Sequence, residues 1–239
     1  MALKSKIEWT ENTWNPITGC SKVSEGCQNC YASTLALRLQ RMGNPKYANG
    51  FNLTLHENSL NDPYTWKKPS RIFVNSMSDL FHDGISLEYI QKVFDVMNNN
   101  QRHVFQVLTK RSRRLEEMST MLNWTENIWL GVTVENARNK NRIEHLRNTP
   151  ATIKFVSFEP LIGDVDEVDL SGIDWAIVGG ESGWKSRPMK KEWVINIKNQ
   201  CEQQGTLFYF KQWGGANKRQ AGRLLLERTW DDMPARAQR

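Results

Sequence analysis

Residues 14–31 read WNPITGCSKVSEGCQNCY, and this stretch sets three cysteines, Cys20, Cys27 and Cys30, within eleven residues. Their spacing is C-x6-C-x2-C, after an extended-looking segment that ends at Gly19. Three thiolates leave a structural zinc site incomplete, because such a site takes four protein ligands. A cubane iron–sulfur cluster held by three thiolates instead keeps one iron open for a substrate or cofactor. Residues 19–30 are therefore predicted to form a cluster-binding loop.

Zinc is the alternative for this loop, with a distant side chain as the fourth ligand. The candidates for that ligand are His56, His82, His103, His145 and Cys201. A disulfide scaffold is not expected, because the chain has only 4 cysteines in 239 residues. Cys201 shares a helical stripe with Trp193 and Ile197, before a helix stop at Gly205, so it is predicted to be a core residue.

Composition bounds the class of protein. A chain of 239 residues with 39% hydrophobic residues can bury one substantial α/β core. The first residues carry no apolar run of signal-peptide length, and the sequence has no apolar run of about eighteen residues that could span a bilayer, so we expect a cytoplasmic protein with no membrane segment. The net charge of +6 and the 10 tryptophans favour a nucleic-acid or nucleotide partner.

A strand-then-helix rhythm follows the cysteine loop. Runs rich in β-branched and aromatic residues lie at 71–74, 103–108, 128–132, 152–156, 174–178 and 207–210. Each resembles a strand buried on both faces, and helical patterns fill the intervals. The order predicts an α/β fold, a partial TIM-like (βα)6–7 barrel of parallel strands with helices outside, over residues 1–215. Residues 216–239 are expected to form a basic extension docked on the barrel or trailing from it.

Two helices can be specified further. Tyr31, Leu35, Leu39 and Met42 recur at helical spacing, so a helix with this apolar face is predicted directly after Cys30. Ser86 is predicted to cap a second helix, and Asn136 to serve as a cap or turn residue.

Polar residues follow each predicted strand. They occupy positions 75–79, 109–111, 133–136, 157–160, 179–183 and 211–214. Active sites of such barrels lie at the carboxyl ends of the strands, so these residues are expected to share one rim with the cysteine loop.

Seven segments together carry a family resemblance. Besides the cysteine stretch they are NSMSDLF (75–81), VLTKR (107–111), GVTVE (131–135), FEPL (158–161), VGGESG (178–183) and FKQWG (210–214). The chain resembles the phage and bacterial three-cysteine-motif family, which is similar to radical S-adenosylmethionine enzymes and distantly to spore photoproduct lyase. Two departures from the radical enzymes stand out. Their usual spacing is C-x3-C-x2-C, and the aromatic that precedes their third cysteine is replaced here by Asn29.

The resemblance implies a cofactor pair and a chemistry. Cys20, Cys27 and Cys30 would hold a [4Fe-4S] cluster, and S-adenosylmethionine would bind the fourth iron and yield a 5′-deoxyadenosyl radical. An external reducing electron donor is implied as well.

The resemblance also implies roles for individual residues. Ser76, Ser78 and Asp79 would accept the methionyl amine, and Lys110 or Arg111, beside Thr109, would pair with the carboxylate. Further expected roles are contacts to ribose (Glu135 or Glu159), contacts to adenine (Tyr31, Gly179, Gly180) and substrate-facing catalytic groups (Glu181, Lys211). Lys211 has an alternative role as an ion-pair partner at the barrel seam.

A nucleic-acid base or nucleotide is the expected substrate, in DNA repair or base modification. The reaction class, whether lyase, isomerase or transferase, stays open. Two other functions stay open too. One is a non-catalytic nucleic-acid-binding protein stapled by zinc or a cluster. The other is a metal-dependent nuclease that uses Asp79, Glu135, Glu159 and Glu181.

Overall fold

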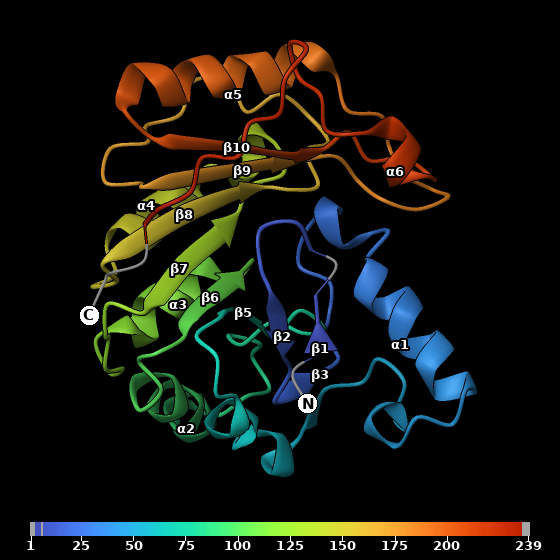
Figure 1. Cartoon of the computed structure of the whole chain (residues 1–239), viewed down its shortest axis with the longest axis vertical. Coiled ribbons are helices and arrows are strands. Elements are labelled where there is room, and N and C mark those ends of the chain that lie inside the picture. Colours follow the sequence, from blue (N-terminus) through green and yellow to red (C-terminus); the bar gives the residue numbers. More distant parts are fainter. Residues whose placement is uncertain (1–2, 6, 236–239) are drawn as a thin grey trace.

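A computed structural model of the chain describes residues 3–5 and 7–235, and Figure 1 shows a curled sheet with helices around it. The sheet has eight strands in the order β1-β2-β5-β6-β7-β8-β9-β10. Seven are parallel, and β1 is antiparallel to β2. Their bounds are Leu3–Lys4, Asn12–Trp14, Arg71–Val74, Val104–Thr109, Ile128–Thr133, Ile153–Phe158, Trp175–Gly179 and Leu207–Gln212. The predicted partial TIM-like α/β barrel is confirmed.

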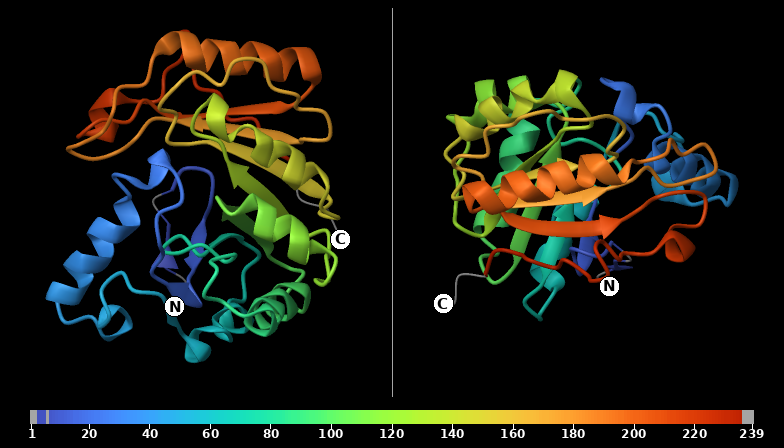
Figure 2. Two further views of the ribbon diagram at one scale, coloured as in Figure 1. Left: turned by 180° about the vertical axis from the view of Figure 1, so that it is seen from behind. Right: turned by 90° about the horizontal axis from the view of Figure 1, so that it is seen from above.

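Helices α2 to α5 lie on the outer face of the half-barrel, whereas α1 stands beside its mouth (Figures 1 and 2). The α-helices are α1 Tyr31–Arg41, α2 Leu87–Asn98, α3 Ser112–Ser119, α4 Asn141–Arg147, α5 Lys191–Gln204 and α6 Lys218–Ala221. Short 3-10 helices are η1 Glu25–Cys27, η2 Pro45–Tyr47, η3 Glu57–Ser59, η4 Asp62–Thr65 and η5 Ala137–Asn139. In the described part of the chain no helix has the length and apolar character needed to cross a membrane.

Several predicted helix ends are confirmed. The Ser86 hydroxyl accepts a hydrogen bond from the Tyr89 amide at the start of α2, and Asn136 caps η5. Gly205 ends α5 with φ +71°, in the left-handed region that glycine enters most easily. Cys201 is fully buried in α5, as predicted.

The segment before the cysteine loop differs from the expectation of one extended run from Trp14 to Gly19. The first parallel strand, β2, ends at Trp14, and β3 (Ile17–Thr18) pairs with β4 (Thr54–Leu55) in a separate two-stranded sheet. Gly19 then has φ +82°, and a Cβ there would lie 2.2 Å from the Asn52 carbonyl oxygen. This close approach turns the chain away from the barrel wall and into the cysteine loop.

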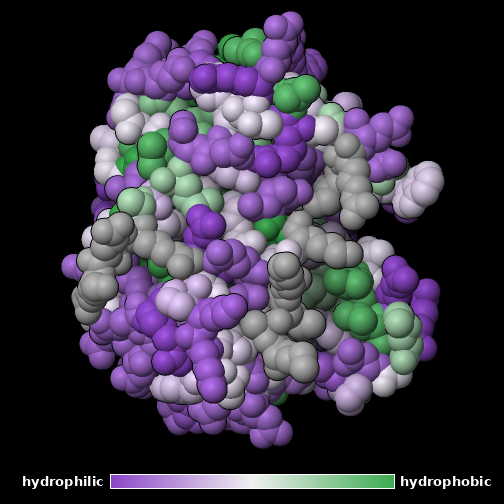
Figure 3. Space-filling model, viewed as in Figure 1, coloured by the Kyte–Doolittle hydropathy of each residue, from purple (hydrophilic) through white to green (hydrophobic). Residues whose placement is uncertain are grey.

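The predicted apolar face of α1 is wrong, although the helix itself begins where expected. Ala32 and Ala36 are its buried residues, whereas Tyr31 is 51% exposed and Met42 is 69% exposed. Small side chains let the α1 backbone approach Tyr47 and Met77 closely, which rotates the larger apolar residues outward. Figure 3 shows apolar residues gathered on the side of the molecule where α1 lies.

The sheet is packed on both faces because successive side chains point to opposite sides. Outward residues such as Val107, Val132 and Val156 join one core with the helices. Inward residues form a second cluster, the aromatic plug, made of Trp9, Phe73, Trp129, Phe155, Trp175 and Tyr209. Its rings meet edge to face, with centroids 6.2 Å apart for Trp129 and Trp175 and 5.8 Å apart for Trp175 and Tyr209. The plug fills the amino-terminal half of the barrel.

Residues 230–232 run beside β10 at the end of the sheet. The Phe210 amide donates to the Trp230 carbonyl at 2.9 Å, and Tyr209 forms an antiparallel bridge with Asp231. The Trp175 indole also donates to the Asp232 carbonyl at 2.8 Å. The domain boundary at residue 215 stays a prediction.

The aromatic plug leaves no room for an extra carbon at Gly131. A Cβ there would lie 2.4 Å from the Phe155 ring, so Gly131→Ala should lower the free energy of unfolding by about 1–3 kcal/mol through overpacking. Urea denaturation of the wild type and the variant measures the loss. In the double variant with Phe155→Leu the two losses should be less than additive. Full additivity, or an unchanged stability of Gly131→Ala, would contradict the packing.

Candidate functional site

A cavity of about 400 Å³ opens at the carboxyl ends of the strands, above the aromatic plug. Its size is that of a small-molecule site. Nearly every residue that the sequence singled out lines it: Cys20, Cys27, Cys30, Tyr31, Ser76, Ser78, Asp79, Thr109, Lys110, Arg111, Glu159, Gly180, Glu181 and Lys211. Glu135 and Gly179 are the two that do not. The fold thus brings together side chains that are as much as 191 positions apart, from Cys20 to Lys211.

The three cysteines enter the cavity from three different local structures. Cys20 follows the Gly19 turn, Cys27 ends η1, and Cys30 is the N-cap residue of α1. All three thiols are free and half-buried. Three cysteines that line one cavity supply the number and kind of donors that a cluster with one open iron needs. Across residues 3–5 and 7–235, no three His, Cys, Asp or Glu side chains are arranged to hold a metal ion between them.

None of the side chains considered as a fourth zinc ligand lines the cavity with the three cysteines, although His82 contacts the cysteine loop through Ser21. His56 bonds to Thr18, His82 to Ser21, His103 to the Trp66 carbonyl and His145 to Ser112, while Cys201 is in the core. The sequence alternative of a four-ligand zinc ion therefore gains no support from the positions of these residues.

Asp79 and Arg111 form a buried pair below Cys20. The Asp79 carboxylate accepts hydrogen bonds from the Thr109 hydroxyl at 2.7 Å and from the Lys110 amide at 3.0 Å. Arg111 Nη1 lies 3.7 Å from Asp79 and 3.6 Å from the Cys20 sulfur, and its Nη2 donates to the Ser21 hydroxyl. Burial, together with the Asp79 charge, raises the pKa of the Cys20 thiol to about 11, against the opposing effect of Arg111.

Glu135 is not where a ribose contact requires it. It is fully buried beneath the cysteine loop, where it accepts from the Ser24 hydroxyl at 2.6 Å and from Arg142 at 2.9 Å. Gly26 lies directly against it, since a Cβ at that position would be 2.4 Å from the carboxylate. Glu135 therefore supports the loop from below, and the prediction that it binds ribose does not fit its position.

Glu159 and Lys211 form an ion pair across the cavity wall. The lysine Nζ lies 2.6 Å and 2.9 Å from the two Glu159 oxygens. Lys211 falls where the register of β10 against β9 shifts, and such bulges re-aim side chains. This contact is the ion-pair role that the sequence left open for Lys211. The Gly179 backbone packs against Glu159, which keeps Gly179 out of the cavity lining.

Glu181, which follows β9, joins that strand end to the cysteine loop. Its carboxylate accepts from the Arg187 backbone and guanidinium and, at 3.0 Å, from Asn29. Arg187 also reaches the Glu25 carbonyl at 3.0 Å. Burial alone would raise the pKa of Glu181, but the hydrogen bonds from Arg187 and Asn29 outweigh it and lower that pKa.

The two serines that follow β5, Ser76 and Ser78, both form hydrogen bonds within the protein. The Ser78 hydroxyl donates to the Ile17 carbonyl at 2.9 Å, and Ser76 exchanges hydrogen bonds with the Asn15 side chain. Tyr31 donates its hydroxyl to the Ser76 carbonyl. The Tyr31 contact thus connects the start of α1 to the carboxyl end of β5.

Three residues that shape the site were missed from the sequence, namely Ser24, Arg142 and Arg187, and a fourth, Gly26, was marked only by its place before Cys27. Ser24, Gly26 and Arg187 have partners more than a hundred positions away in the chain. Arg142 reaches Glu135 from a different element, α4. Only the glycine before Cys27 carried a signal, because a backbone that must approach a neighbour closely favours glycine.

Residues 4–234 match the family described as protein of unknown function (DUF5131). The chain belongs to this family. The match does not confirm the resemblance to the three-cysteine-motif family. No curated protein matches the sequence.

Solved structures of spore photoproduct lyase share the fold of this DUF5131 member. One mutant superposes with a TM-score of 0.57 at 12% identity, covering 89% of this chain and 79% of that one. A second mutant gives 0.55 at 11% identity, covering 88% and 78%. A third mutant, solved with dinucleoside spore photoproduct, gives 0.50 at 12% identity, covering 85% and 64%. At these identities the likeness concerns the fold.

The contact between Gly26 and Glu135 gives a test of the cysteine loop. Gly26→Ala should push the loop away from the buried carboxylate, at a cost of about 1–3 kcal/mol, and so reduce the iron and acid-labile sulfide retained after anaerobic reconstitution. Lys22→Ala, an exposed change in the same loop, serves as the control and should retain both. Wild-type iron content in Gly26→Ala would contradict this support.

The pair of Glu181 and Arg187 predicts a pH dependence of stability. The folded pKa of Glu181 lies below its ordinary value of 4.5, so its stabilising effect is complete above that pH and disappears as the pH falls through the folded pKa. Arg187→Ala should therefore be destabilised relative to wild type near neutral pH, and the difference should shrink in acid. Urea titrations at a series of pH values measure it, and a pH-independent difference would refute the coupling.

Proposed function

We propose that this protein is a radical S-adenosylmethionine enzyme that acts on a nucleic-acid base or nucleotide. The proposal rests on one observation above all: three thiols and the polar ends of the strands line a single cavity in a half-barrel whose other end is plugged. The fold shared with spore photoproduct lyase supports it, because one solved structure of that enzyme holds a dinucleoside spore photoproduct.

Cys20, Cys27 and Cys30 are the proposed ligands of a [4Fe-4S] cluster, and S-adenosylmethionine is the proposed second cofactor. When bound, the two supply hydrogen-atom abstraction by a 5′-deoxyadenosyl radical. An external one-electron donor is part of the proposal, since this chemistry consumes an electron.

The residues of the chain would bind and orient the cofactor. Arg111 already contacts Asp79 and Ser21, so we assign Lys110, which lines the cavity, to the methionyl carboxylate. The Ser76 and Ser78 oxygens are assigned to the amine. The remaining assignments are ribose for Glu159 and adenine for Tyr31 and the Gly180 backbone. The aromatic plug would exclude water from the closed end of the cavity.

Glu181 and Lys211 would then act by position. Each is held in an ion pair, Glu181 with Arg187 and Lys211 with Glu159, so neither presents a free charge to a substrate. We assign both residues to shaping the mouth and wall of the cavity. A contact with the substrate would be a hydrogen bond and not an ion pair.

The nuclease alternative is not favoured by the charges at the rim. A two-metal or one-metal nuclease needs carboxylates that converge on a cation. Here each of the four carboxylates faces a basic side chain: Asp79 with Arg111, Glu135 with Arg142, Glu159 with Lys211 and Glu181 with Arg187.

The decisive experiment is to reconstitute the cluster anaerobically, reduce it with dithionite, add S-adenosylmethionine and quantify 5′-deoxyadenosine by chromatography. The wild type should produce it, and Cys27→Ala should lose both the product and the brown iron–sulfur absorbance. Cys201→Ala, which changes the buried cysteine of α5, should retain both. A colourless zinc protein, or equal product from Cys27→Ala, would refute the proposal.

A further inference from the structure

Trp184 stands apart from the other tryptophans of the chain. Its side chain is 94% exposed, whereas the other nine tryptophans are buried or half-buried. A fully exposed indole forgoes the large burial energy that tryptophan normally contributes to a core. Its sequence neighbours are also polar or small, namely Gly183, Lys185 and Ser186. Trp184 is therefore an exposed aromatic side chain within a polar turn, and it belongs to a different segment from the apolar residues that α1 exposes.

The backbone fixes where Trp184 points. The Ser186 amide donates to the Gly183 carbonyl at 3.1 Å, which closes a turn with Trp184 and Lys185 at its centre. Gly183 has φ +118°, a conformation that side chains rarely allow. Its amide donates to the Gly215 carbonyl at 3.0 Å, and the Gly215 amide donates back to the Glu181 carbonyl at 2.9 Å. The indole is thus presented by an anchored turn.

This turn lies at the mouth of the cavity. Gly180, Glu181 and Ser182, immediately before it, line the cavity, and the Lys185 carbonyl accepts a 2.8 Å hydrogen bond from Asn29 of the cysteine loop. Trp184 is therefore two residues from the cavity lining, on the rim that the cysteine loop shares.

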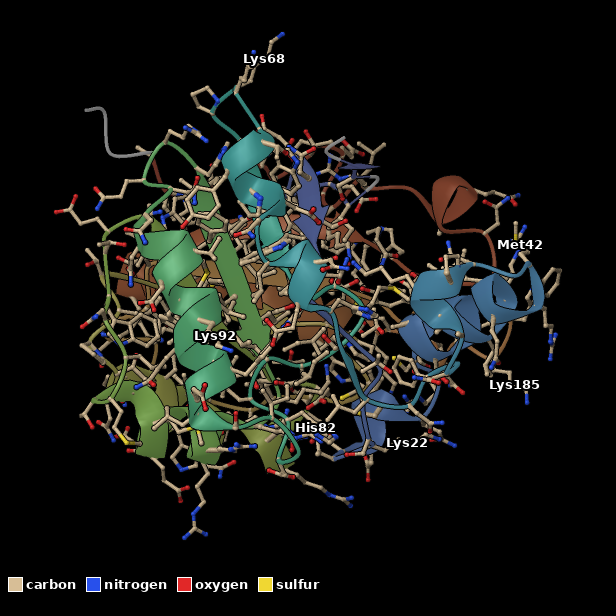
Figure 4. All side chains as sticks on the ribbon, turned by 90° about the horizontal axis from the view of Figure 1, so that it is seen from below. Lys22, Met42, Lys68, His82, Lys92 and Lys185 are labelled. Carbon is tan, nitrogen blue, oxygen red and sulfur yellow. The ribbon has the colours of Figure 1, made fainter. Side chains whose placement is uncertain are left out.

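Exposed lysines accompany the turn. Figure 4 shows Lys185 and Lys22 on the side of the molecule where α1 lies, well away from Lys68. Both are exposed, and Lys110 lines the cavity between the strand ends. The rim carboxylates are already paired with basic side chains, so these lysines give the mouth a positive field.

We propose that Trp184 is a stacking platform for an unpaired base of single-stranded nucleic acid, with Lys185 and Lys22 on the adjoining phosphates. An indole that offers its face to solvent beside lysines matches the two interactions that bind such strands, base stacking and phosphate neutralisation. A strand held there extends one neighbouring nucleotide toward the cavity. The fate of that nucleotide in the cavity rests on the function proposed above, whereas the binding itself does not.

The test is the binding of a fluorescein-labelled single-stranded oligonucleotide of about twelve nucleotides to the full chain, followed by anisotropy. Trp184→Ala should weaken binding by about 5- to 150-fold, the loss of one stacked base, and Trp184→Phe should restore part of it. Tyr64→Ala, which removes an exposed aromatic from η4, is the matched control and should bind as the wild type does.

The salt dependence of binding and the tryptophan emission are two further measurements, and a purely structural role of Trp184 or Lys185 would change neither. Lys185→Ala should lower the slope of log affinity against log salt by about 0.7, and Lys68→Ala should leave it unchanged. Binding should also quench tryptophan emission in the wild type, and this quenching should be largely lost in Trp184→Phe.

Three results would overturn the inference. They are equal affinity of wild type and Trp184→Ala, a Trp184-dependent attachment to anionic lipid vesicles without oligonucleotide binding, and a concentration-dependent dimer that Trp184→Ala abolishes. Oligonucleotide binding without 5′-deoxyadenosine formation would refute the proposed enzyme and leave this inference standing. Formation of 5′-deoxyadenosine without oligonucleotide binding would refute this inference and leave the proposed enzyme standing.

Discussion

The parallel pairing of seven strands governs everything else in this molecule, because it sends all their carboxyl ends to one rim. Four carboxylates follow four of these ends: Asp79 after β5, Glu135 after β7, Glu159 after β8 and Glu181 after β9. A buried carboxylate is costly unless a cation and hydrogen bonds satisfy it. Each of the four accordingly meets an arginine or lysine. Three of these carboxylates line the cavity, and Glu135 lies beneath the cysteine loop.

Residues of these ion pairs also hold the cysteine loop. Arg111 bonds to Ser21, Glu135 supports Ser24, and Arg187 reaches the Glu25 carbonyl while Glu181 binds Asn29. The loop is longer than that of the radical enzymes it resembles, and this length lets it touch the rim at several points. A loop fixed in this way is preorganised, since the groups around it determine its shape.

The sequence was most informative where burial on both faces leaves a clear pattern. The strands from β5 to β10 lie within a residue or two of their expected positions, because short continuous runs of β-branched and aromatic residues are typical of parallel strands buried on both faces. The polar rim follows from the same pattern. The face of α1 could not be predicted, because Ala32 and Ala36 determine its contact by being small. The partners of Glu135 and Glu181 could not be predicted either, because Arg142 and Arg187 lie only seven and six residues further along the chain and reach back across irregular turns, whose path the sequence pattern does not specify.

Strand β10 is the edge strand of an open sheet, and an exposed edge strand can pair with another chain. An uncovered outer strand with an aromatic sequence such as LFYF offers unpaired amides and carbonyls to any other extended chain, and so invites aggregation. Here Trp230 and Asp231 bond to part of that backbone and lie alongside it. The basic terminal segment therefore shields the free border of the sheet, whatever else it binds.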